Sequence, residues 1–112
     1  MKADSMQAVS VTSSYQIGIE TISFSVTNNS ETELSVNDYN TIEKKINEDE
    51  WELFSAPAYD AWEKTLAPGE KHDFIIWLYP ENYDYSVGFY RVCKTFNQNN
   101  TYHEYYFEFY LS

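Results

Sequence analysis

Apolar and polar residues alternate along most of this chain of 112 residues. In the stretch TISFSVTN, residues 21–28, the apolar Ile22, Phe24 and Val26 share one parity, and small polar residues occupy the other. A period of two places successive side chains on opposite faces of a β-strand, so each such run predicts a strand with one buried and one solvated face. Long runs with the 3.6-residue period of an amphipathic helix are hard to find. The alternation therefore predicts an all-β fold.

Turn-forming residues separate the alternating runs. Pro68-Gly69 lies directly before the run 71–79, and proline followed by glycine suits the two central positions of a tight turn. The runs 28–30 and 97–100 are rich in residues that end strands. We expect a bend over residues 15–18 and strands over residues 8–14, 21–28, 33–36, 41–46, 50–54, 62–66, 71–79, 87–96 and 101–111.

About seven to nine short strands, with turn signals roughly every 8 to 12 residues, predict a sandwich of two antiparallel sheets. A small barrel is the alternative. A chain of this length forms one domain and buries a core without help from disulfides or metals. The side chains expected to point into that core are Ile22, Phe24, Val26, Phe74, Ile76, Leu78, Tyr90, Val92, Tyr105, Phe107, Phe109 and Leu111.

The first seven residues, MKADSMQ, lack the apolar core of a signal peptide. We expect residues 1–7 to be a tail outside the fold, either disordered or derived from cloning, and residues 8–112 to form the domain. A stub left after removal of a signal segment would look the same.

The charge of the chain narrows the range of partners. Eighteen acidic and seven basic residues give a formal net charge of −11. Such a surface repels phosphate groups, so we expect no nucleic-acid partner and no affinity for anionic lipid surfaces. No run approaches the roughly 18 apolar residues of a membrane span, so we expect no direct membrane insertion. Cys93 is the single cysteine, which leaves no intrachain disulfide.

No group of residues has the spacing of a known catalytic or metal-binding motif. His72 and His103 have no partner at ligand spacing, and the acidic runs 48–50 and 81–84 do not match the calcium loop of an EF-hand. The chain also lacks a Gly-x-Ser-x-Gly elbow and a glycine-rich phosphate loop. We therefore expect a protein that is not an enzyme, without catalytic residues, cofactor or bound metal.

Aromatic residues directed away from the core are the better indication of function. Aromatic residues make up 19% of the chain, and parity turns several of them outward. On the run 71–79, Trp77 and Tyr79 face outward together with Ile75. Aromatic residues and arginine are enriched at protein interfaces, although cross-strand aromatic pairs also stabilise a sheet by themselves. The predicted interaction face, on adjacent strands, consists of Phe89, Arg91, Tyr106, Glu108 and Tyr110.

Four segments, in order along the chain, resemble those of a known family. They are ISFSVTNNSETELSV (22–36), IEKKINEDEWELF (42–54), LAPGEKHDF (66–74) and GFYRVCKTF (88–96). They are similar to bacterial immunoglobulin-like domains of exported proteins and lipoproteins of Gram-positive bacteria. The resemblance runs from about Tyr15 to the end of the chain. It departs from the family pattern at Val87-Gly88, where the family usually has Pro-Gly.

The resemblance implies an immunoglobulin-like β-sandwich. Tyr90 would then be the tyrosine corner, and Val92 would occupy the position of the usual inward cysteine. Cys93 has the opposite parity, so we expect it to face outward or lie at a sheet edge as a half-buried small hydrophobe.

The resemblance also implies a non-enzymatic interaction or spacer domain in the cell envelope or outside the cell. Its partner would be another protein or a neighbouring domain, and a segment outside this chain could carry a lipid anchor. A cytoplasmic location is the alternative. The identity of the partner and the oligomeric state stay open.

Two other functions also stay open. Trp62 and the turn 66–70 resemble the bacterial intracellular proteinase inhibitor family, in which an exposed loop, here 55–60 or 80–86, would engage a protease. A carbohydrate-binding module would instead present a flat aromatic platform to a sugar ring. The candidates for that platform are Trp51, Trp62 and Trp77.

Overall fold

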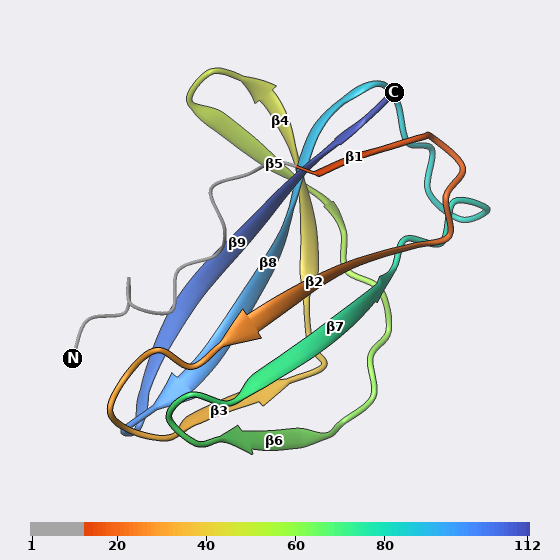
Figure 1. The fold of residues 1–112 in the computed structure, drawn as a ribbon. Helices are drawn as coiled ribbons and strands as arrows, with labels where there is room; N and C mark the ends of the chain where they lie inside the picture. The colour runs from red at the N-terminus through yellow and green to blue at the C-terminus, as the bar shows by residue number, and fades with distance from the viewer. Residues whose placement is uncertain (1–12) are drawn as a thin grey trace.

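The computed structural model describes residues 13–112, and this part of the chain is all-β (Figure 1). Its strands are β1 Ser13–Tyr15, β2 Thr21–Thr27, β3 Leu34–Asn37, β4 Thr41–Asn47, β5 Glu50–Ser55, β6 Glu63–Leu66, β7 Lys71–Trp77, β8 Gly88–Gln98 and β9 Thr101–Leu111. Both the fold class and the expected number of strands are confirmed. The predicted tail 1–7 and residues 8–12 of the first predicted strand lie outside the described residues.

Two sheets form the layers of the sandwich. The larger sheet is built on the β8–β9 hairpin, whose strands pair along their whole length. Beside β8, two strands follow each other end to end: β4 pairs with the first part of β8, and β3 pairs near its end. β5 lies outside β4 and β6 outside β3. The second sheet consists of the antiparallel pair β2 and β7.

One pairing differs from the predicted antiparallel arrangement. β1 runs parallel to β9, with Ser13 opposite Phe109 and Tyr15 opposite Leu111. Beyond β1 the chain bends back toward β2, and Gly18 takes a φ of 101° in this bend. A parallel partner comes from a remote part of the chain, so local alternation carries no information about it.

The β8–β9 turn is shorter than the polar run 97–100 predicts. Asn97 and Gln98 belong to β8, and Gln98 is buried, where its Nε2 donates to Ser30 Oγ at 2.7 Å. Only Asn99 and Asn100 connect the strands, with φ angles of 54° and 62°. Positive φ at both central residues gives a two-residue loop the twist of a hairpin, and asparagine tolerates this region better than most residues.

The core lies between the two sheets. Of the predicted inward residues, all are buried except Phe24, which is half-buried. Phe24 nevertheless stacks on Phe107 and Phe74, with ring centres 3.7 and 5.4 Å away, and so joins the sheets. The core also contains residues that the parity argument did not name: Leu34, Val36, Ile42, Leu66, Tyr85 and Phe96.

Strand β7 ends at Trp77, two residues earlier than predicted. Tyr79 has a φ of 52°, and its carbonyl accepts bonds from the backbone N–H groups of Asn82 and Tyr83. Leu78 is still buried, as parity predicts. The chain therefore leaves the sheet in a compact turn rather than an extended strand.

The predicted Pro68-Gly69 turn is present, with a φ of 88° at Gly69. It is joined to the turn after β2, because Gly69 N donates to Asn28 O at 2.7 Å and Asn28 N donates to Glu70 O at 2.9 Å. Asn28 itself is fully buried. The two turns therefore form one unit at the end of the small sheet.

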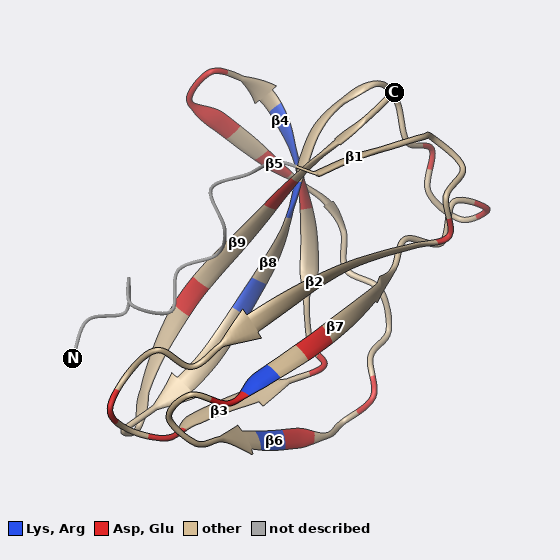
Figure 2. Cartoon of the chain, viewed as in Figure 1, with Lys and Arg blue, Asp and Glu red and all other residues tan. Residues whose placement is uncertain are grey.

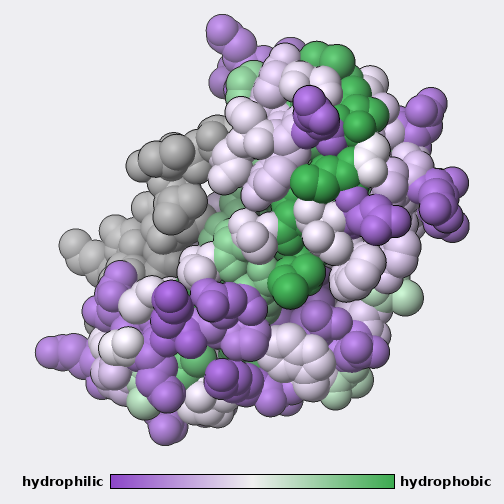
Figure 3. Space-filling view, turned by 45° about the vertical axis from the view of Figure 1, so that its right-hand side comes forward, coloured by the Kyte–Doolittle hydropathy of each residue, from purple (hydrophilic) through white to green (hydrophobic). Residues whose placement is uncertain are grey.

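Charge and hydrophobicity are unevenly distributed over the surface. Every described lysine and arginine lies on a strand, whereas many acidic residues lie in loops and at the tip of the β4–β5 hairpin (Figure 2). The face in Figure 3 carries a band of hydrophobic residues bordered by hydrophilic ones. The most exposed large hydrophobic residues are Leu53, Ile75, Val87 and Tyr102.

Candidate functional site

The predicted interaction face lies on the side of the larger sheet that is turned away from the core. Phe89 and Arg91 come from β8, and Tyr106, Glu108 and Tyr110 come from β9. The register places Phe89 opposite Tyr110 and Arg91 opposite Glu108. These five side chains therefore share one surface.

Strands β4 and β5 widen this surface. Glu43 on β4 pairs with Arg91 on one side and with Leu53 of β5 on the other. Lys45 pairs with Trp51 of β5. Together the four strands present what is named here the outer face: Glu43, Lys45, Trp51, Leu53, Phe89, Arg91, Cys93, Tyr106, Glu108 and Tyr110.

Arg91 is the centre of the outer face. The central carbon of its guanidinium group lies 4.3 Å from the centre of the Trp51 ring and 4.0 Å from that of Tyr106. Its Nη2 and Nε lie 2.6 and 2.7 Å from Glu43 Oε1. The two rings and the carboxylate already restrict the Arg91 side chain, so it loses little conformational entropy when a partner binds.

Two neighbouring groups have raised pKa values. Tyr106 donates its hydroxyl to Glu104 Oε2 at 2.7 Å, and this bond, with burial, raises the pKa of Tyr106. Cys93 lies opposite Tyr106 and is half-buried; burial, with the nearby Glu43 carboxylate, raises the pKa of its thiol to about 12. The thiol is therefore protonated at neutral pH, in keeping with the small hydrophobe that parity predicts.

The margin of the outer face is accessible. Leu53 is 61% exposed, Phe89 41% and Tyr106 38%. Tyr110 is half-buried rather than fully outward, because its ring packs on Phe89 with the centres 4.8 Å apart. Lys45 places its Nζ 5.7 Å from the centre of the Phe89 ring. Aromatic rings and an arginine with free apolar surface beside them have the composition typical of interface centres.

Sequence reasoning missed half of this arrangement. It placed Glu108 beside Arg91, which the register shows, but it did not find Glu43, which holds the arginine. It also did not bring Trp51 or Leu53 to this surface. The available signal was the β4–β5 hairpin, since its pairing fixes which side chains face outward, but only the β4–β8 register brings them to Arg91.

Tyr90 lies on the inner side of the same strand. Its hydroxyl accepts a bond from Ser86 N and donates one to Ser86 O, both at 3.0 Å. A tyrosine that binds the backbone a few residues upstream is the tyrosine corner of immunoglobulin-like sandwiches. Val92 is buried two residues later, where such sandwiches often have an inward cysteine.

The three tryptophans that a sugar platform would use lie in different surroundings. Trp51 stacks on Arg91 on the outer face. Trp62 is half-buried against His72 and Phe74. Trp77, on β7, is 54% exposed. The structure therefore does not assemble the three rings into one platform.

The two segments predicted as inhibitory loops differ in accessibility. In 80–86, Tyr85 is buried and donates its hydroxyl to Leu78 O at 2.8 Å, and Tyr83 packs against the core, so this segment is anchored. In 55–60, Ser55 is buried at the end of β5, whereas residues 58–60 are exposed.

Among residues 13–112, no three His, Cys, Asp or Glu side chains are placed to hold a metal ion. The same part of the chain has no helix that is long and apolar enough to cross a membrane. His72 packs against Trp62 and Phe74, and burial, together with the nearby Lys64, lowers its pKa.

The two-layer sandwich and the tyrosine corner define an immunoglobulin-like β-sandwich domain. A family described as bacterial Ig-like domain matches residues 5–109. The chain belongs to this family, as its sequence motifs predict. No curated protein matches the chain.

Proposed function

We propose that this domain is a non-enzymatic protein-interaction module of the cell envelope or the extracellular space. It contacts a protein partner or a neighbouring domain through the outer face. One observation carries the proposal: Arg91 is held between the Trp51 and Tyr106 rings, and exposed Leu53 and Phe89 lie on the same face. Membership in the bacterial Ig-like family supports a role without catalysis.

The order already present in the outer face favours binding. Immobilising a long side chain at an interface costs roughly 0.5–1.5 kcal/mol, and this cost is already met for Arg91 by its two rings and by Glu43. Tryptophan, tyrosine and arginine are also the residues that most often dominate binding energy. A partner would gain most by covering this centre and the apolar margin.

The charge balance of the outer face supports the same conclusion. Lys45 and Arg91 offset Glu43 and Glu108 within it, and Glu104 beside Tyr106 adds one negative charge, whereas the whole chain carries a net charge of −11. Other surfaces of the domain repel acidic proteins more strongly than this face does. The outer face is therefore the surface on which a neutral or acidic partner meets least repulsion.

The test is a pull-down with the folded domain as bait, against envelope and secreted proteins of the source bacterium. The variant Leu53→Ser/Tyr106→Ser removes apolar surface from the outer face. Tyr102→Ser is the matched control, because it removes an even more exposed tyrosine from the same strand, on the same side but near the β8–β9 turn and away from Arg91. We expect a partner captured by the wild type and by the control but lost with the double variant. Capture of the same proteins by all three would overturn the proposal.

A further inference from the structure

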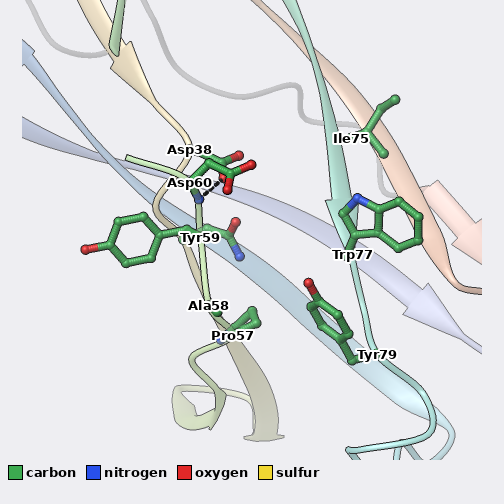
Figure 4. Close-up of a pocket in the computed structure, with 9 residues that line it drawn as sticks. Asp38, Pro57, Ala58, Tyr59, Asp60, Ile75, Trp77 and Tyr79 are labelled. Atoms are coloured by element: carbon green, nitrogen blue, oxygen red, sulfur yellow. Dashed lines mark hydrogen bonds between the residues drawn. The ribbon is translucent and has the colours of Figure 1, made fainter. Parts of the chain in front are cut away.

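A groove of about 280 Å³ lies between β7 and the segment 57–60, away from the outer face. Figure 4 shows Ile75 and Trp77 of β7, followed by Tyr79 in the turn after this strand, on one side of it. The carboxylates of Asp38 and Asp60 lie together on the other side. The groove therefore combines an aromatic wall with a negatively charged wall.

The strand beside the groove has an unused edge. Among the described residues, β7 pairs with β2 alone. In Figure 4, β2 lies on one side of β7 and the segment 57–60 on the other. The edge of β7 that faces the groove therefore presents backbone N–H and C=O groups without a strand partner. Such an edge is a template for an extended chain that adds as a further strand.

The acidic wall is held in place by the backbone. Asp38 Oδ2 accepts a hydrogen bond from Asp60 N at 2.7 Å, which brings the two side chains together. No lysine or arginine lines the groove. The buried Lys94 interacts with Asp38 from the core side, but the groove itself offers two carboxylates and no cation. These carboxylates attract a positively charged group, and the net charge of −11 acts in the same direction.

One buried hydrogen-bond donor at this groove, the side-chain amide of Asn40, has no acceptor. Asn40 lines it and is only 8% exposed, and its Nδ2 has no hydrogen-bond partner. Buried polar groups are nearly always paired in folded proteins. Because Nδ2 itself is covered, the amide would have to turn toward the groove before a backbone carbonyl of an incoming chain could pair with this N–H.

We propose that the groove binds an extended peptide segment that carries a lysine or arginine side chain. The segment adds to the free edge of β7, and one of its carbonyls pairs with Asn40 Nδ2 once this amide turns toward the groove. Its cationic side chain lies between the carboxylates of Asp38 and Asp60 and the exposed ring of Trp77, which favours a cation over its face. A neutral sugar would use the ring and the carboxylates but would leave the strand edge unpaired.

The first experiment follows the three indole N–H signals of the ¹⁵N-labelled chain by NMR during peptide titration. The probe is a blocked heptapeptide in which valine and threonine alternate around a central lysine. Its controls carry glutamate in place of the lysine, or N-methyl groups along one backbone edge. We expect the lysine peptide to shift the indole of Trp77 and the amides of β7, but not the indole of Trp51. Both control peptides should bind at least about tenfold more weakly, because each lacks one source of recognition.

The second experiment repeats the titration with variants. Asp38→Asn/Asp60→Asn removes both charges, and the new amide oxygen at residue 38 still accepts the bond from the backbone N–H of residue 60. We expect about a tenfold loss of affinity for the lysine peptide, and a similar loss in Trp77→Ser. Leu53→Ser/Tyr106→Ser, on the outer face, should bind as the wild type does. This variant keeps the outcome separate from that of the proposed protein interface.

Three results would overturn the inference. The first is equal binding of the lysine and glutamate peptides. The second is an absence of shifts at Trp77 with peptide at several millimolar. The third is a response of the Trp77 indole to a neutral oligosaccharide, such as cellohexaose, with none to the peptides.

Discussion

Lys94 places its Nζ 4.4 Å from the centre of the Phe74 ring, inside the core of the sandwich. The side chain is 1% exposed, and its Nζ donates to Asn37 O at 3.0 Å. Burial lowers the pKa of this ammonium group to about 8, against the opposing effect of the nearby Asp38 carboxylate. The domain therefore folds with a cation that the core disfavours.

Replacing Lys94 with methionine should change how stability depends on pH. The folded-state pKa lies below that of the unfolded chain, so the unfolded state binds more protons between about pH 8 and 10.5. Below pH 8 the buried charge therefore lowers the free energy of unfolding of the wild type by its full amount, roughly 3 kcal/mol at most. This loss of stability becomes smaller as the pH rises above 8. Relative to the wild type, Lys94→Met should be most stable near pH 7 and lose that advantage by pH 10.

Urea unfolding of both proteins at several pH values measures this difference. Cys93, Tyr85 and Tyr105 also have raised pKa values, but they titrate in both proteins and cancel in the comparison. The lost bond to Asn37 O lowers the stability of the variant by a similar amount at every pH. A stability difference that stays constant from pH 7 to 10 would show that Lys94 titrates normally.

Tyr90→Phe should destabilise the domain by about 1–2 kcal/mol, because it removes the two hydrogen bonds that the hydroxyl makes to the backbone of Ser86. The ring remains to pack against Phe109, so the fold should be kept. Thermal and urea unfolding measure the loss. Tyr102→Phe is the control, since Tyr102 is exposed and should tolerate the change. Equal stability of the two variants would argue against an energetic role for the tyrosine corner.

Asn28→Ala should destabilise the domain more strongly, by about 2–4 kcal/mol. The buried amide donates from Nδ2 to Thr32 O and Leu66 O, and its Oδ1 accepts from both N and Oγ of Ser30. Alanine leaves these groups unpaired. Asn29→Ala changes the exposed neighbour and should alter the free energy of unfolding by less than about 0.5 kcal/mol. Similar urea midpoints for the two variants would contradict this role of Asn28.

The buried Asn28 and Gln98 show where sequence reasoning about the fold reached its limit. Period-two alternation places side chains such as Ile76 and Phe107 correctly, because burial of one face fixes parity. Polar residues after a strand, however, predict a solvated turn by default. Here each amide group donates to an acceptor distant in sequence, Asn28 to Leu66 O and Gln98 to Ser30 Oγ, and no local pattern encodes such a partner.

The outer face shows the same limit for the candidate site. Parity within β8 and β9 is a local property, so the sequence alone predicts that Arg91 and Tyr106 face outward. The contact of Arg91 with Trp51 depends on the pairing of β4 with β8, which joins segments almost 50 residues apart. The groove beside β7 depends likewise on the path of the segment 57–60. Sequence alternation predicts which side chains of a strand face the core and which face solvent, but it does not predict which strands lie next to one another.

Cys93 should react slowly with iodoacetamide in the folded domain. Burial raises the pKa of its thiol to about 12, and only the thiolate reacts, so alkylation at pH 8 should be at least about a hundredfold slower than in urea. Mass spectrometry of timed samples gives both rates. Glu43→Gln removes the carboxylate that, after burial, contributes most to the raised pKa, so this variant should react faster than the wild type while still folded. Rapid alkylation of the folded wild type would show that the outer face opens around Cys93 and would contradict the ordered arrangement of Arg91, Trp51 and Tyr106.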